Sequence, residues 1–277
     1  MKRILGLAAV VLITAGMLPA QTAGGGAPQP QPASPQAEPS PQPATGSKVK
    51  AAKTQQEYAA YQAAASEKDI AKAETEASEF ASKFPDSDLR SVLYEQLMQR
   101  YEQANNAEKT LEMSRKVLAF DPDSVPALLT ASSVMAERTN ETDPDLQQRH
   151  EEIMKDSSRA IQLIDTGAFQ PSQITPEQLN SYKSSAYAAQ GTLELIEKNN
   201  EAAEQSLRKA TELNTLNPEP AIWLRLVIAL DHQKKYADAL AVANRALAIS
   251  ASDPDALKQV TYEQTRLKVL TDTKPAH

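Results

Sequence analysis

The chain has 277 residues, no cysteine and a formal net charge of −7, and 41% of its residues are hydrophobic. Without cysteine there is no disulfide, no thiol nucleophile and no thiolate zinc site. Nucleic acid requires a basic stripe on its partner, so an acidic chain predicts no nucleic-acid partner. Much of the apolar content is alanine, and an alanine-rich, glycine-poor composition favours helices.

The first 20 residues are typical of an export signal. Lys2 and Arg3 give a positive start, and residues 4–18 form an apolar run that is short for a membrane span. Ala20 supplies a small residue at the expected cleavage point, with Ala23 as a second candidate. We therefore expect a periplasmic or secreted protein with no membrane span after cleavage; an uncleaved membrane anchor is the alternative. Cleavage would leave 27 lysines and arginines against 36 aspartates and glutamates, a charge of −9.

Residues 21–47 are rich in proline, glutamine and alanine. Prolines stand at positions 28, 30, 32, 35, 39, 41 and 43. Proline fixes φ and lacks an amide donor, so neither a helix nor a sheet is expected there. The composition predicts a disordered, extended linker that acts as a spacer.

The clearest helical pattern lies at residues 94–122. Large apolar residues recur there at intervals of three and four: Tyr94, Leu97, Met98 and Tyr101. After an interruption at Asn105 and Asn106, a second and smaller face follows: Thr110, Ser114, Val117 and Phe120. The two faces predict a hairpin of two helices that ends at Asp121 and Pro122.

The same spacing recurs along the chain. A second clear copy combines two helical faces: Trp223, Leu226, Val227 and Leu230, then Ala239, Ala243, Ala246 and Ile249. In both copies the first aromatic residue precedes the first small residue of the second helix by 16 positions. Three weaker copies start at Glu57, Leu128 and Tyr187. Glu57 breaks the aromatic pattern but keeps the 16-residue spacing to Ala73.

The third copy departs from this register. Its second helix would start its face at Pro144, so the face is carried instead by Ile153, Ser157, Ala160 and Leu163. An insertion of about nine residues, 138–146, is therefore expected, with Asp143, Pro144 and Asp145 as the cap and first turn of a longer helix. Such a loop is either neutral or part of a binding face.

Two later helices carry clear start signals. Thr175 is the expected N-cap of a helix over residues 176–198, followed by Pro176 and by the acid Glu177. Asp253, Pro254 and Asp255 are expected to start a last helix that runs to about residue 270. The last helix would cover the end of the core with Leu257, Val260 and Leu267.

The offset of 16 and a period of about 34 residues resemble the tetratricopeptide repeat (TPR) from about residue 54 to residue 270. The resemblance implies an all-α solenoid of helical hairpins, with about five hairpins and a C-terminal capping helix. The domain is expected over residues 48–270, followed by a disordered tail over residues 271–277. A plain helical bundle is the alternative, although a bundle has no reason to keep the offset in several copies.

No motif of catalysis or metal binding is recognisable. From residue 48 on, the only glycines are Gly167 and Gly191, so a glycine-rich phosphate loop is missing. The histidines His150, His232 and His277 are far apart in sequence, and no Gly-x-Ser-x-Gly motif occurs. We expect no enzymatic activity, no cofactor and no metal.

TPR proteins bind extended peptides or partner helices on the concave face that the first helices form. The resemblance therefore implies a groove lined by these residues: Tyr58, Gln62, Glu95, Gln99, Glu102, Leu129, Ala188, Thr192, Leu195, Leu224 and Ile228. Its N-terminal half would be acidic and its C-terminal half apolar. Ordinary burial against a neighbouring helix is the alternative for Leu195, Leu224 and Ile228.

The function that follows is an exported, non-enzymatic scaffold that binds another protein or a peptide, with envelope assembly as the expected setting. Two alternatives stay open. One is a solenoid that associates with copies of itself. The other is an accessory domain of an envelope enzyme complex.

Overall fold

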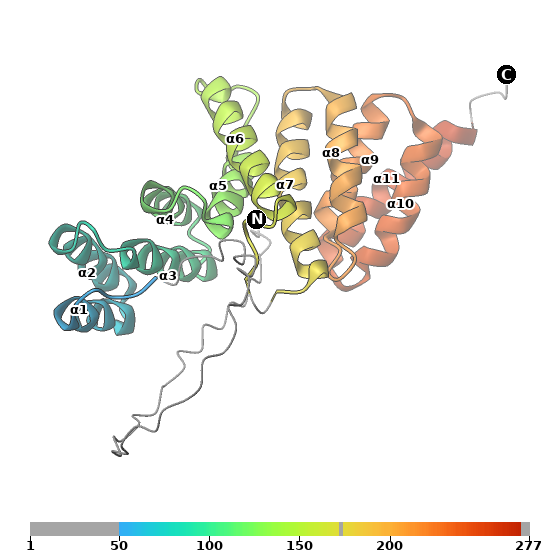
Figure 1. The fold of residues 1–277 in the computed structure, drawn as a ribbon. Coiled ribbons are helices and arrows are strands. Elements are labelled where there is room, and N and C mark those ends of the chain that lie inside the picture. The colour runs from blue at the N-terminus through green and yellow to red at the C-terminus, as the bar shows by residue number, and fades with distance from the viewer. Residues whose placement is uncertain (1–49, 172–173, 273–277) are drawn as a thin grey trace, which may run out of the picture.

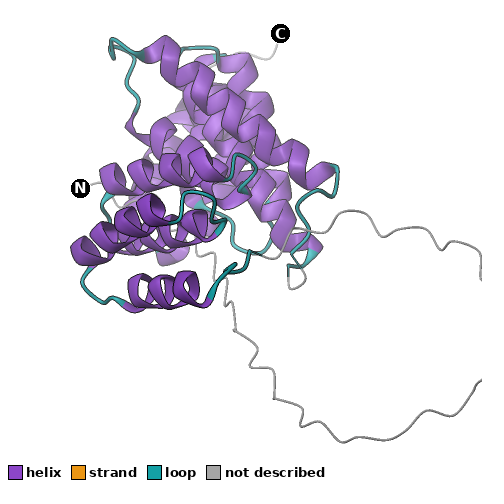
Figure 2. Cartoon of the chain, turned by 60° about the vertical axis from the view of Figure 1, so that its left-hand side comes forward, coloured by secondary structure: helices purple, strands orange, loops and turns teal. Residues whose placement is uncertain are grey.

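The computed structural model describes residues 50–171 and 174–272. The predicted signal peptide (residues 1–20) and linker (residues 21–47) lie outside these residues. The described chain is helical and contains no strand (Figure 2). Its α-helices are α1 (Gln55–Ser66), α2 (Ile70–Lys83), α3 (Leu89–Gln103), α4 (Ala107–Phe120), α5 (Val125–Arg138), α6 (Leu146–Asp165), α7 (Pro176–Ile196), α8 (Asn200–Leu213), α9 (Pro220–His232), α10 (Tyr236–Ile249) and α11 (Pro254–Asp272).

The helices pack in chain order as five hairpins, α1–α2, α3–α4, α5–α6, α7–α8 and α9–α10, with α11 against the last one. Figure 1 shows the array running from α1 at one end to α11 at the other. The predicted solenoid of TPR-like hairpins with a C-terminal capping helix is confirmed. Helix α11 continues to Asp272, two residues beyond its expected end.

Small residues at the helix crossings let the paired helices approach closely. Ala203, Ala239 and Ser114 are fully buried in their second helices. Gly191 is required by the same geometry, since a Cβ there would lie 2.6 Å from the Leu207 Cγ of α8. Larger apolar side chains fill the space between hairpins, and the core continues from α1 to α11 as a series of adjoining clusters.

Glu57 departs from the aromatic pattern because it helps to start α1. Its carboxylate accepts a hydrogen bond from the Lys53 amide at 2.7 Å, and the Thr54 hydroxyl accepts one from the Glu57 amide at 3.1 Å. This arrangement resembles a capping box, except that the carboxylate reaches the amide one residue before the N-cap. The residue is buried although it is charged.

The structure corrects two predictions about helices. Helix α6 begins at Leu146, and not within residues 143–145, because the Asp143 carboxylate accepts the Asn140 amide at 2.9 Å and closes a turn before the helix. Phe120 does not join the buried face of α4 but is 37% exposed. Its ring lies against the Tyr94 ring, with centroids 5.8 Å apart, and under the Arg90 guanidinium.

The start of α7 confirms its predicted cap. Thr175 and Gln178 form a capping box, with Pro176 as the first residue and Glu177 in the first turn. At the end of α6, Gly167 has a φ of +71°, as expected of a glycine that ends a helix. Helices α6 and α7, with 20 and 21 residues, are longer than the other paired helices and lengthen the third and fourth hairpins.

Candidate functional site

One groove of about 1000 Å³ crosses the middle of the array. We call it the interhelical groove. Its walls come from the α3–α4 turn and from helices α5, α7 and α9, so four successive hairpins contribute to it. Residues from the start of the insertion, Arg138 and Asn140, also line it.

Small side chains on α5 and α7 leave room for the groove. Ser133 and Ala136 of α5 face it together with Ala188 and Ala189 of α7. Helix α5 packs directly against α7, whereas α3 and α5 diverge. Because of this divergence, the α3–α4 turn stands opposite the first helices of the later hairpins, with Asn105 held at a φ of +54°.

Three of the predicted partner-binding residues line the interhelical groove: Glu102, Ala188 and Thr192. The Thr192 hydroxyl donates a hydrogen bond of 2.7 Å to the Ala188 carbonyl, and the residue is 7% exposed. The predicted partner-binding set and the lining of the interhelical groove therefore overlap on α3 and α7.

Eight predicted residues lie outside its lining, five of them on α1, α3 and α7. Tyr58 and Gln62 are exposed on α1, where the Gln62 amide donates to the Tyr58 hydroxyl at 2.9 Å. Glu95 and Gln99 are half-buried on α3. Burial raises the pKa of Glu95, which lies near Lys50 and Asp121. Leu195 of α7 is half-buried against the core of the last two hairpins.

The structure corrects the predicted register on α5 and α9. Leu129 is fully buried in the core and cannot contact a partner. On α9 the residues that line the groove are Ile222 and Arg225, preceded by Glu219, and not Leu224 and Ile228. The positions two residues after Leu128, Tyr187 and Trp223 all line the groove, namely Thr130, Ala189 and Arg225, so the predicted offset missed part of a shared face.

One signal in the sequence pointed to this face of α9. Arg225 is the only charged residue between Pro220 and Leu230. A single charge within an otherwise apolar helix indicates a polar partner, and Arg225 finds it in Glu137 of α5, with which it forms an ion pair. Glu137 is the ninth residue after Leu128, beyond the positions that the motif predicts.

Acidic residues dominate the charge of the interhelical groove. Four glutamates, at positions 102, 108, 137 and 219, face two arginines, at positions 138 and 225. Burial raises the pKa of the Glu219 carboxyl, the Arg225 guanidinium opposes this shift, and the Glu137 carboxylate adds to it.

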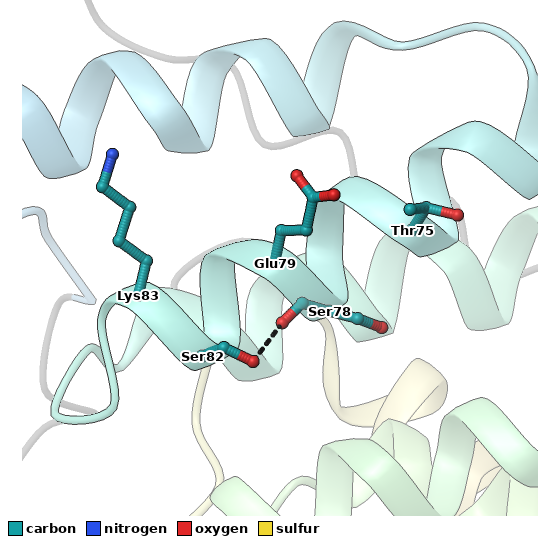
Figure 3. Close-up of a pocket in the computed structure, with 5 residues that line it drawn as sticks. All are labelled: Thr75, Ser78, Glu79, Ser82 and Lys83. Atoms are coloured by element: carbon teal, nitrogen blue, oxygen red, sulfur yellow. Dashed lines mark hydrogen bonds between the residues drawn. The ribbon is translucent and has the colours of Figure 1, made fainter.

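A second depression of about 510 Å³ lies on α2 (Figure 3). Its five lining residues, Thr75, Ser78, Glu79, Ser82 and Lys83, all belong to this one helix. The Ser82 hydroxyl donates to the Ser78 carbonyl at 2.9 Å, so the hydroxyls are partly used by the helix itself. Because the surface of one helix forms it, we do not treat it as a binding site.

Within residues 50–171 and 174–272, no cluster of three or more histidine, aspartate and glutamate side chains could hold a metal ion. None of the helices in this part is long and apolar enough to cross a membrane.

No protein-family model and no curated protein matches the sequence. Solved structures with a similar fold include three proteins. MamA is 12% identical, covers 63% of this chain and 94% of its own, and has a TM-score of 0.41. The TPR protein TTC0263 of Thermus thermophilus is 15% identical, with coverages of 76% and 99% and a TM-score of 0.45. PilW, a type IV pilus biogenesis factor, is 16% identical, with coverages of 80% and 96% and a TM-score of 0.42.

At these scores the likeness carries no inference about function, and the assignment as a TPR-like array rests on the repeat spacing and the hairpins described above.

Proposed function

We propose that the chain is an exported, non-enzymatic scaffold that binds a segment of another protein in the interhelical groove during envelope assembly. The observation that carries the proposal is the extent of the groove, to which four successive hairpins contribute. A groove that crosses several repeats suits an extended polypeptide, which can contact each repeat in turn.

The lining supports the same conclusion. Alanine, serine and threonine side chains on α5 and α7 leave the groove open, and charged side chains stand along it. Such a mixture of apolar floor and polar groups fixes both the position and the identity of a bound chain. The export and envelope parts of the proposal rest on the signal-like residues 1–20.

Site-specific photocrosslinking in the native cell tests the proposal. A benzophenone amino acid placed at Ser133, which is half-buried and lines the groove, should form adducts with a partner protein that mass spectrometry can identify. The matched control places it at Thr75, exposed on α2. Adducts of the same protein and yield at both positions, or none at Ser133, would contradict groove binding. Fractionation of these cells, beside a variant with charged residues at positions 10–12, tests export.

Self-association is a second candidate, because the last helix exposes apolar side chains. Tyr262 is 67% exposed and Val269 is 59% exposed on α11, at the end of the array. Light scattering on the purified protein decides this question, since a monomer over a wide concentration range would exclude it.

A further inference from the structure

We propose that the interhelical groove selects a polypeptide segment that places a lysine or arginine side chain beside Glu219 and Glu137. The inference rests on the proposed function and adds the chemistry of the bound segment. It differs from the prediction made from sequence, which placed the acidic end of the groove on α3 and an apolar end on α9.

The charge balance between α5 and α9 is incomplete. Glu137 and Arg225 form an ion pair across the two helices, and Glu219 stands at the N-terminal end of α9 on the same groove wall. Two carboxylates therefore lie near one guanidinium, and Arg225 forms its ion pair with only one of them, Glu137. A cation on the bound segment would neutralise the other.

The Glu219 carboxylate does not cap α9, and its favourable charged neighbour is Arg225. The residue is the N-cap of α9, but its side chain makes no capping hydrogen bond, and the first helical residue is Pro220. Within the described part of the chain, no hydrogen bond reaches this carboxylate. It is nevertheless half-buried, and this burial raises its pKa. A carboxylate that is desolvated without a compensating donor is a binding group for a ligand donor.

The floor beside Glu219 suits the stem of a long cationic side chain. Ile222, three residues after Glu219 on α9, and Ala188 and Ala189 of α7 are apolar residues of the groove lining. Lysine and arginine lay their methylene groups on apolar surfaces while the charged end reaches a polar partner. Glu102 and Asn105, at the α3–α4 turn, line the same groove, so the remaining residues of the segment can contact another hairpin. An acidic segment would instead meet four glutamates against two arginines.

The test is a selection from a library of random ten-residue peptides displayed on phage, with the full chain as the immobilised target. Peptides that bind the wild type should be enriched at least tenfold in lysine or arginine at one position. Glu219→Gln should remove this enrichment, and Glu219→Lys should replace it by aspartate or glutamate. Glu212→Gln is the matched control, since Glu212 is exposed on α8 outside the groove, and should keep the wild-type preference. Circular dichroism confirms that each variant is folded.

The outcomes separate this inference from the proposed function. Binding peptides that lack a basic residue, or an unchanged basic preference in the folded Glu219→Gln variant, would overturn the inference and leave groove binding intact. If the wild type selects no peptide, or selects equally well when Ser133→Trp fills the groove, both fail.

Discussion

Two carboxylates, one on α6 and one on α7, are buried inside the array, and their burial raises their pKa values. Asp156 is 5% exposed and Glu194 is 9% exposed. Burial, followed by the nearby Glu152 carboxylate, raises the pKa of Asp156 to about 6. Burial also raises the pKa of Glu194, although Ser206 donates a hydrogen bond to it. Both side chains therefore bind a proton more tightly in the folded state than in the unfolded chain.

This shift makes stability depend on pH with a defined sign. A carboxyl whose pKa is raised by folding destabilises the fold as pH rises from its unfolded value, 3.8, to its folded value, about 6 for Asp156. Asp156→Asn removes the charge and keeps the shape. We expect the free energy of unfolding of this variant to exceed that of the wild type by on the order of 2 kcal/mol at pH 7.5, and to be similar to it near pH 4.

Urea unfolding at the two pH values checks this expectation. Glu151→Gln, on the exposed side of the same helix, is the control and should leave the pH dependence of the wild type unchanged. An Asp156→Asn variant that keeps the full pH dependence would show that the Asp156 carboxyl is not charged at a cost in the folded state.

The burial of Asp156 and Glu219 could not be predicted from the sequence. Neither stands out in the sequence, because their burial depends on which helix of another hairpin covers them. Thr175 and Asp253, by contrast, could be predicted as caps, since an N-cap depends only on the few residues that follow it.

At the scale of the elements, the turn within three hairpins repeats to the residue. Asn105, Lys198 and Lys234 each have a φ between 54° and 61°, and each stands 11 residues after the first aromatic of its copy, Tyr94, Tyr187 or Trp223. The following amide donates to a carbonyl five residues earlier in each case: Asn106 to Tyr101, Asn199 to Glu194 and Lys235 to Leu230. This is the Schellman bond that ends a helix, and it normally favours glycine.

Two of the three positions hold lysine, for which the left-handed conformation is unfavourable by about 1 kcal/mol. Lys234→Gly should therefore raise the free energy of unfolding by up to about 1 kcal/mol, less the larger entropy of glycine in the unfolded chain. Lys234→Ala removes the same side chain but keeps the strained φ, so it should stay at the wild-type value. Thermal unfolding of the two variants compares them directly, and an alanine variant as stable as the glycine variant would rule out backbone strain as the cause.

The ends of helices were more predictable than the lengths of the loops between them. Prolines 85, 122, 176, 220 and 254 lie next to helix boundaries in the structure, because proline lacks the amide that a helix interior needs and disfavours the helical conformation in the residue before it. The insertion after α5 was located correctly, but the start of α6 was not. Asp143 belongs to the turn, and Asp145 is the residue before α6. This division depends on how the loop folds back, which the sequence alone does not show.

At the scale of the whole molecule, the array decides which residues reach the interhelical groove. The order of the hairpins and their small crossing residues can be read from the pattern of residues, and these fix the core. Which residues of a first helix line the groove depends on how the neighbouring helices pack, and on α9 the lining residues are Ile222 and Arg225 rather than the predicted Leu224 and Ile228. The repeat motif therefore selects first helices that also line the interhelical groove, without fixing which residues of each helix line it.

The same array predicts how the molecule loses structure. Each hairpin contacts its neighbours, so stability is approximately a sum of local terms and nearest-neighbour interfaces. Phe80 of α2 is buried at one end, with its ring 6.4 Å from the Tyr61 ring and 5.0 Å from the Phe84 ring. Phe80→Ala removes a core side chain that is typically worth about 3–5 kcal/mol. We expect the loss to fall on α1 and α2, while α8 to α10 stay protected.

Hydrogen–deuterium exchange with mass spectrometry reads this pattern helix by helix. Leu230→Ala is the matched variant at the other end, since Leu230 is fully buried in α9, and it should expose α9 to α11 while leaving α1 and α2 at wild-type protection. Two opposite gradients of exchange would show that the hairpins open from the damaged end. A uniform loss of protection in both variants would mean that the α4–α5 junction couples the two ends tightly enough for the array to unfold as one unit.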